Sequence, residues 1–295
     1  MRGTIQLDQV VNEQVGHSEL TTGTDGQFAF ARVPAHVVYR VQAAGCLDRQ
    51  STWAVTEDRS ALAVELICES PRLSLDFYRT FVRNLRDSTS GPMFLRPLTE
   101  PPRFYVRTVL EDTGETVPAA IVTGLRRVFE NSVDELSGGR LHMASFETGT
   151  LTRSPEPGLV RVGFRHFVDD FTAGETVGLG SSGIAVTLIY DPRFDTDDIK
   201  AMNYAANCES ITVGVAEHEI VHVMGFDHTE TTPQDFQTTD CSGHGRPQRV
   251  RDAARVMYSR PFGNKDPDLD PPAFIAPARV SDHGNRTICP WSLIR

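Results

Sequence analysis

One eleven-residue segment, residues 218–228, constrains this chain more than any other part of it. It reads H-E-x-x-H-x-x-G-x-x-H at every fixed position. Histidines four residues apart lie on one face of a helix, so His218 and His222 can reach a common metal ion. If the helix continued, His228 would lie about 240° around the axis from His222. The chain must therefore turn, and Gly225 stands where a left-handed residue can end the helix.

These residue types also predict a chemistry. Three neutral imidazoles are a ligand set typical of a catalytic zinc ion, with the fourth tetrahedral position left to water. Zinc lowers the pKa of that water and polarises a carbonyl group. Glu219 can act as general base toward the water and then as general acid toward the leaving amine. The predicted metal ligands are thus His218, His222 and His228, the predicted catalytic residue is Glu219, and the implied reaction is hydrolysis of a peptide bond. A surface helix that carries histidines by chance is the alternative.

The segment resembles the active-site motif of the metzincin clan of zinc endopeptidases. Residues 255–259, Arg-Val-Met-Tyr-Ser, resemble the clan's second signature, a methionine in a tight turn beneath the metal. The Met-Tyr pair is similar to the matrixin form, which implies that Met257 supports the site from below and makes Tyr258 at most a wall residue. Taken alone, a methionine such as Met257 is more often an ordinary core residue.

Two features depart from the matrixin pattern. Thr229 follows the third histidine where matrixins have serine, and 28 residues separate His228 from Met257, more than matrixins use. The chain also lacks the P-R-C-G-x-P-D segment that keeps matrixin zymogens inactive. The resemblance therefore extends to the clan and not to a subfamily.

The resemblance implies a zincin-like α+β fold for residues 103–295, with a twisted mixed sheet, a long helix and the zinc-binding helix. Residues 1–70 are expected to form an all-β sandwich, with strands at residues 1–7, 24–30, 37–43 and 61–67. They resemble transthyretin-like, carboxypeptidase-regulatory-like modules at Thr24-Asp25-Gly26-Gln27-Phe28, Val33-Pro34, Tyr39-Arg40-Val41 and Ala44-Gly45. Residues 71–102 are expected to be a linker that packs on the catalytic domain, with a short helix that carries Phe77, Phe81 and Leu85.

Hydrophobic patterning predicts the elements of the catalytic part. Strands are expected at residues 104–110, 141–147, 159–165 and 184–190. A long helix is expected from Pro118 to Gly138, with an apolar face made of Ile121, Leu125, Val128, Phe129, Val133 and Leu136. The zinc-binding helix is expected to begin at Ser210 or Thr212. In metzincins the strand before this helix is a sheet edge along which peptide lies, so residues 184–190 are the candidate substrate edge.

Composition and charge limit the partners. The chain has a net charge of −10, which argues against nucleic acid or an anionic membrane as the main partner. No apolar run approaches the roughly 18 to 20 residues that span a bilayer. The first residues lack the apolar core of a signal peptide. We expect protein or peptide substrates, a monomer, and a secreted, cell-surface or periplasmic location after removal of a leader; a cytoplasmic location is the alternative.

Five cysteines are distributed over both parts of the chain. The spacing makes Cys46 with Cys68 and Cys208 with Cys241 plausible disulfides, which leaves Cys289 free. Five buried thiols are the alternative.

Residues 264–270 carry three carboxylates at alternate positions, Asp266, Asp268 and Asp270. Oxygen ligands at this spacing could hold Ca²⁺, although the segment lacks the glycine and the distal glutamate of an EF-hand. A solvated acidic loop is the more usual meaning of such a run.

The sequence as a whole predicts a secreted or surface-exposed zinc metalloendopeptidase with an N-terminal β-sandwich. The first alternative is an extracellular binding or adhesion protein with a structural or inactive zinc site, and the second is an exopeptidase.

Overall fold

The computed structural model describes most of the centre of the chain and shorter segments elsewhere. The described residues are 4–11, 14–21, 37–43, 46–48, 53–55, 66–82, 97–166, 174–177, 183–194, 196–197, 200, 207–228, 241–243 and 245–260. They divide into two compact units. One unit contains the described strands before residue 69, and the other contains the described residues from 97 to 259.

The first unit consists of short strands. Four of them form an antiparallel sheet in the order β2-β1-β3-β5, namely β1 (Thr4–Val11), β2 (Gln14–Thr21), β3 (Val37–Ala43) and β5 (Trp53–Val55). The other two, β4 (Cys46–Asp48) and β6 (Leu66–Cys68), pair with each other. The strand predicted at residues 37–43 is confirmed. The strand predicted at residues 1–7 is confirmed for residues 4–7 and continues to Val11. Residues 24–30 and 61–65 lie outside the described residues, and a sandwich arrangement stays a prediction.

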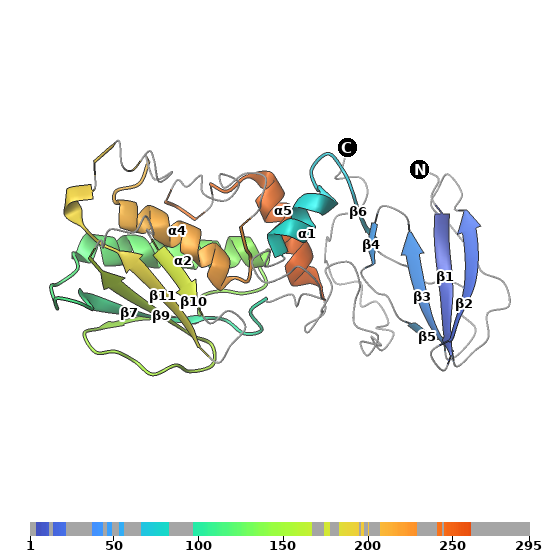
Figure 1. Ribbon diagram of the computed structural model, residues 1–295, viewed down its shortest axis with the longest axis horizontal. Coiled ribbons are helices and arrows are strands. Elements are labelled where there is room, and N and C mark those ends of the chain that lie inside the picture. Colours follow the sequence, from blue (N-terminus) through green and yellow to red (C-terminus); the bar gives the residue numbers. More distant parts are fainter. Residues whose placement is uncertain are drawn as a thin grey trace. The chain divides into compact units, whose positions relative to one another are not determined.

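The second unit is an α/β fold built on a mixed five-stranded sheet (Figure 1). The strand order is β10-β11-β9-β7-β8, with bounds β7 Arg103–Leu110, β8 Ser145–Gly149, β9 Leu159–Arg165, β10 Gly174–Val177 and β11 Ile184–Ile189. Four strands are parallel, and β10 runs antiparallel to β11 at one edge. The predicted strands at 104–110 and 159–165 are confirmed.

The strand predicted at residues 141–147 begins later than expected. Its pairing with β7 starts at Ser145, which lies opposite Arg103. Before that point the amide of Leu141 donates to the Ser137 hydroxyl at 2.9 Å, and the amide of Ala144 donates to the carbonyl of Pro102 at 2.9 Å. The apolar pattern assigns Leu141 to a strand, whereas its amide instead bonds locally to the end of the preceding helix.

The predicted substrate edge is also wrong. Residues 184–189 form β11, which pairs on one side with β9 and on the other with β10, so it is an internal strand. The edge on this side is β10, whose four residues Gly-Glu-Thr-Val combine a glycine with a charge. Short, polar edge strands of this kind carry little hydrophobic periodicity, so the sequence pattern did not reveal it.

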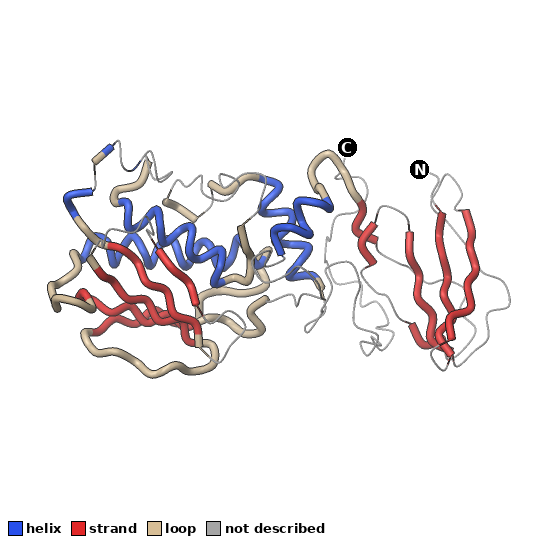
Figure 2. Tube along the Cα trace, in the orientation of Figure 1, coloured by secondary structure: helices blue, strands red, loops and turns tan. Residues whose placement is uncertain are grey.

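Helices cover one face of this sheet (Figure 2). The longest, α2 (Ala119–Ser137), begins after Pro118 and ends at Gly138, which has a φ of 64°. All six residues of its predicted apolar face are buried. Helix α4 (Ile211–Val223) lies beside it, and Gly124 of α2 permits the close approach because a Cβ there would lie 2.9 Å from Val213. The predicted long helix is confirmed.

Three shorter helices complete the described fold: α1 (Leu75–Val82), the 3₁₀ helix η1 (Pro192–Phe194) and α5 (Gln248–Ser259). Phe77 and Phe81 lie in α1 as expected, while Leu85 lies outside the described residues. Among the described helices, none combines the length and the apolar character that crossing a membrane requires.

The expectation that Met257 occupies a tight turn is wrong. Met257 and Tyr258 both lie in the last turn of α5, and both are buried. The buried residues of α5, namely Val250, Ala253, Ala254, Val256, Met257 and Tyr258, follow a helical spacing. Met257 therefore belongs to the buried face of helix α5.

Candidate metal centre

Helix α4 is fixed at its start by local hydrogen bonds. The Ser210 hydroxyl caps the helix by accepting from the amide of Thr212 at 3.2 Å. The Thr212 hydroxyl in turn donates to the carbonyl of Ile189 in β11 at 2.8 Å. Ser210 is thus the N-cap, one of the two residues predicted. The helix is buried on almost all sides, with Val213, Ala216, Ile220 and Val221 in the core as expected.

The chain turns directly after α4, as the motif predicts. Gly225 has a φ of 95°, a left-handed value that side chains other than glycine rarely adopt, and its amide donates to the carbonyl of His222 at 2.8 Å. The amide of Asp227 donates to the carbonyl of Phe81 at 2.9 Å, and the ring of Phe81 stacks on Phe226 with centroids 4.5 Å apart. Contacts with α1 therefore hold the segment that leads to His228.

Tyr258 also supports this turn. Its buried hydroxyl donates to the carbonyl of Met224, the C-cap residue of α4, at 3.0 Å and accepts from the amide of Leu98 at 3.2 Å. Burial raises the pKa of Tyr258 far above its ordinary value, so the hydroxyl keeps its proton. The sequence predicts a wall residue at most, whereas the structure shows a residue that fixes the end of helix α4.

The turn brings the three predicted ligands together. The Nε2 atom of His218 lies 3.1 Å from Nε2 of His228 and 3.3 Å from Nε2 of His222. One ligand nitrogen from each ring lies within 4.8 Å of the others. Two nitrogens bound at 2.0–2.1 Å to one tetrahedral zinc ion lie about 3.3 Å apart. The three side chains therefore fit a metal ion with little movement.

The second nitrogen of His222 has a partner that orients the ring. Its Nδ1 lies 2.9 Å from the carbonyl of Phe226, an acceptor, so Nδ1 carries the proton and Nε2 offers its lone pair to the site. Burial, followed by the neighbouring His222, His228 and Arg246, holds the pKa of His218 well below its usual range. Neutral imidazoles are the form that binds metals.

Glu219 lies beside the histidines, on the side of α4 that faces β10. It is 5% exposed, and its Oε2 accepts a hydrogen bond from the Thr176 hydroxyl at 2.5 Å. Burial raises the pKa of Glu219 to about 7; the bond from Thr176 opposes this rise and the charge of Glu175 adds to it. A carboxyl group with a pKa near neutrality is suited to accept and return a proton.

A second glutamate, Glu217, faces away from Glu219. It is fully buried, and its Oε2 accepts from the amide of Cys241 at 2.8 Å. Its carbonyl accepts from the guanidinium of Arg246 at 2.9 Å. That buried guanidinium also binds the carbonyl of Gly243, and on α2 it binds the Ser132 hydroxyl and the Glu135 carboxylate. Arg246 thus joins α2 to α4 one residue before the first ligand.

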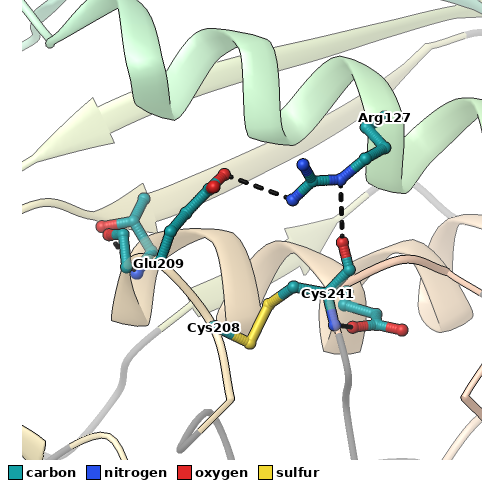
Figure 3. The surroundings of a disulfide bond; sticks show 7 residues. Arg127, Cys208, Glu209 and Cys241 are labelled. Carbon is teal, nitrogen blue, oxygen red and sulfur yellow. Dashed lines mark hydrogen bonds and ion pairs between the residues drawn. A yellow bond between two sulfur atoms is a disulfide. The ribbon is translucent and has the colours of Figure 1, made fainter.

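The predicted disulfide between Cys208 and Cys241 is present. It joins the residue two positions before the N-cap of α4 to a loop that follows the ligands. Figure 3 shows the guanidinium of Arg127, on α2, between the two ends: it binds the carboxylate of Glu209 at 3.3 Å and the carbonyl of Cys241 at 3.2 Å. The disulfide therefore joins the two ends of the segment that carries the three histidines, and Arg127 binds both ends to α2.

Other predicted sites lie beyond what the structure describes. The candidate calcium ligands Asp266, Asp268 and Asp270, the free Cys289 and the divergent Thr229 are outside the described residues. In the pair of β4 with β6 the backbone register sets Cys46 directly opposite Cys68, and a disulfide there stays a prediction.

Four residues around the site were not identified from the sequence: Gly174, Thr176, Glu217 and Arg246. Each is far in sequence from the group that it supports or has no spacing motif of its own. The one available signal was Glu217, a charged residue that directly follows the uncharged residues 213–216 of α4.

Comparison with known proteins adds no relative to this picture. No family model matches the chain, and neither a curated protein nor a solved structure matches it. The assignment of a function therefore rests on the geometry of the histidines and of Glu219.

Proposed function

We propose that this protein is a zinc-dependent endopeptidase in which His218, His222 and His228 hold the metal and Glu219 moves the proton. The observation that carries the proposal is the convergence of three imidazole Nε2 atoms, two of the separations being 3.1 and 3.3 Å, beside a buried carboxylate. The resemblance of residues 218–228 to the metzincin motif supports the same reaction.

The ligand set favours zinc in a catalytic site. Imidazole nitrogens suit zinc and several other transition metals, and a set of three histidines is known for catalytic zinc. Structural zinc sites use four protein ligands. Within the described part of the chain, the cluster at this site consists of three histidines. A cluster of three histidines therefore favours a catalytic site, in which the fourth coordination position of the metal is left to water or substrate.

The protein's own groups account for the proton transfers. When bound, zinc would supply Lewis-acid polarisation of a substrate carbonyl and would acidify water. Oε2 of Glu219 is engaged by Thr176, so Oε1 is the oxygen suited to take a proton from the attacking water. The same oxygen then delivers the proton to the leaving amine. In the metal-free protein, burial raises the pKa of Glu219 to about 7, a value suited to a group that accepts and returns a proton.

Strand β10 is the element that we propose binds the substrate. It is one of the two edge strands of the sheet, and Thr176 links it to Glu219. The exposed backbone of an edge strand can pair with an extended peptide. Pairing along a strand holds a chain on both sides of the reacting bond, which favours an endopeptidase over an exopeptidase.

The disulfide bears on location. Disulfides persist in oxidising compartments and are rare in the cytosol. The bond between Cys208 and Cys241 therefore supports our proposal that the protein acts in a secreted, cell-surface or periplasmic setting.

Cleavage of casein and of peptides blocked at both ends tests the proposal. We expect the protein loaded with zinc to cleave both substrates, to lose activity with a chelator and to regain it with added zinc. His222→Ala should bind zinc more than about 100-fold more weakly, since loss of a ligand exceeds loss of a partner of a ligand. A fully loaded protein that cleaves neither substrate would favour the binding or adhesion protein. Cleavage restricted to unblocked peptides would indicate an exopeptidase.

A further inference from the structure

We propose that Thr176 is a positioning residue that holds the Glu219 carboxylate in the orientation needed for proton transfer. The inference rests on the proposed function and adds a residue that the metal-binding motif does not contain. Its basis is one contact: the Thr176 hydroxyl donates to Oε2 of Glu219 at 2.5 Å. The backbone carbonyl of Glu219 lies 3.4 Å from the same hydroxyl, so the carboxylate is the closer acceptor.

The Thr176 hydroxyl comes from strand β10 and not from helix α4, which carries Glu219. Side chains alternate along a strand, so Thr176 faces the same side as residue 174 and the opposite side from Glu175 and Val177. Residue 174 is glycine, and a Cβ there would lie 2.7 Å from both Oε1 of Glu219 and Cγ1 of Val215. The missing side chain lets β10 approach α4 closely enough for the next inward residue, Thr176, to reach the carboxylate.

The contact has a direct consequence for the chemistry. A glutamate has several rotatable bonds, and fixing it costs conformational entropy at each turnover unless it is held beforehand. Thr176 binds one carboxylate oxygen and leaves Oε1 for water. Proton transfer depends on the placement of the base to within about 1 Å. Loss of the hydroxyl should therefore lower kcat more than it changes KM.

A purely structural link between β10 and α4 would show different behaviour. It would change stability and zinc content together, and a methyl group of the same shape would replace the hydroxyl with little effect on turnover. Thr176→Val removes the donor and keeps the shape, whereas Thr176→Ser keeps the donor and removes a methyl group. Thr187→Val is the matched control: Thr187 is the same residue type on the neighbouring β11, opposite Glu175 and on the other face of the sheet.

The test compares kcat, KM and bound zinc for the full chain and these three variants. Removing a group that orients a catalytic site typically costs about 10- to 100-fold. We expect that loss in kcat for Thr176→Val, recovery to within about threefold for Thr176→Ser, and wild-type values for Thr187→Val, each with wild-type zinc content. If Thr176→Val and Thr187→Val have the same kcat, the positioning role is wrong. If wild type is active in the same experiment, the proposed function is unaffected by that result. Inactive zinc-loaded wild type overturns both.

A second readout needs neither zinc nor turnover. In the metal-free chain, the urea midpoints of Thr176→Val, Glu219→Ala and the double variant form a double-mutant cycle. Each single change removes the same hydrogen bond, so the shift of the double variant should be smaller than the sum of the two single shifts. Additive shifts would contradict the contact on which the proposal depends.

Discussion

Helix α4 carries two buried glutamates on opposite sides, and the two differ in the groups that donate hydrogen bonds to them. Glu217 and Glu219 are two residues apart, so they lie about 200° apart around the helix. Glu217 accepts from a backbone amide, that of Cys241, in a loop that is fixed by a disulfide and by Arg246. Glu219 accepts from a side-chain hydroxyl on a short edge strand.

The difference shows how one helix can combine support with reactivity. On the Glu217 side a covalent bond, a buried guanidinium and α2 fix the position of the helix. On the Glu219 side the carboxyl group has one hydrogen-bond partner among the described residues, lies beside the candidate metal ligands and has a pKa raised to about 7. The first side should therefore govern stability, and the second side should govern chemistry.

Breaking the disulfide should give the largest change in stability on the Glu217 side. The bond spans 33 residues, and cross-links of that size contribute about 3 to 4 kcal/mol. The double variant Cys208→Ser, Cys241→Ser should unfold at a clearly lower urea concentration. Its turnover per folded, zinc-loaded molecule should stay within about tenfold of wild type. An unchanged midpoint would show that the loop is held without the disulfide.

The pH dependence of the unfolding free energy of the metal-free protein tests the environment of Glu219 separately. The pKa of Glu219 rises from 4.5 to about 7 on folding, so between these values the folded state binds more protons than the unfolded state. The contribution of Glu219 to stability therefore falls as pH rises from 4.5 to 7, by about 3 kcal/mol. The difference in unfolding free energy between Glu219→Gln and wild type should grow over this range. The histidines cancel in that difference, and a flat difference would contradict the raised pKa.

Replacing Glu217 sharpens the comparison. Glu217→Leu leaves the buried amide of Cys241 without its acceptor, which costs about 1 to 3 kcal/mol. Glu217→Gln keeps an acceptor oxygen and should cost less. Chemical denaturation measures both, and zinc-loaded turnover should stay close to wild type. A large loss of turnover in a folded, zinc-loaded Glu217→Leu protein would show that the two sides are not separable.

Tyr258→Phe should have the smallest effect. The change removes the hydroxyl that contacts Met224 and Leu98 while it keeps the buried ring, and such hydrogen bonds contribute about 1 kcal/mol each. We expect a stability loss of about 1 to 2 kcal/mol by thermal or urea unfolding. Wild-type stability would show that neither hydrogen bond contributes to holding the turn.

Local patterns predicted much of the fold. The apolar face of α2, its limits at Pro118 and Gly138, and strands β7 and β9 all follow from periodicity and from the conformations of proline and glycine. The convergence of the three histidines follows from their spacing and from the turn at Gly225. Each of these predictions depends on residues close together in the sequence.

The predictions that failed depend on contacts between distant residues. Strand β11 has the stronger β pattern, yet it is internal because four residues with little pattern, residues 174–177, pair with it. Met257 was expected in a turn on the basis of resemblance, whereas helical packing of residues 248–259 determines its place. Thr176 lies 43 residues before Glu219, and no spacing rule connects an edge strand to a particular residue of a helix.

Turnover of an end-blocked peptide by wild type and by Glu219→Ala, each with one zinc ion per chain, tests the central claim most directly. We expect both proteins to bind zinc equally and the variant to be about 10²- to 10⁴-fold slower, the usual contribution of a general base. Equal turnover by the two zinc-loaded proteins, or no turnover by zinc-loaded wild type, would contradict it.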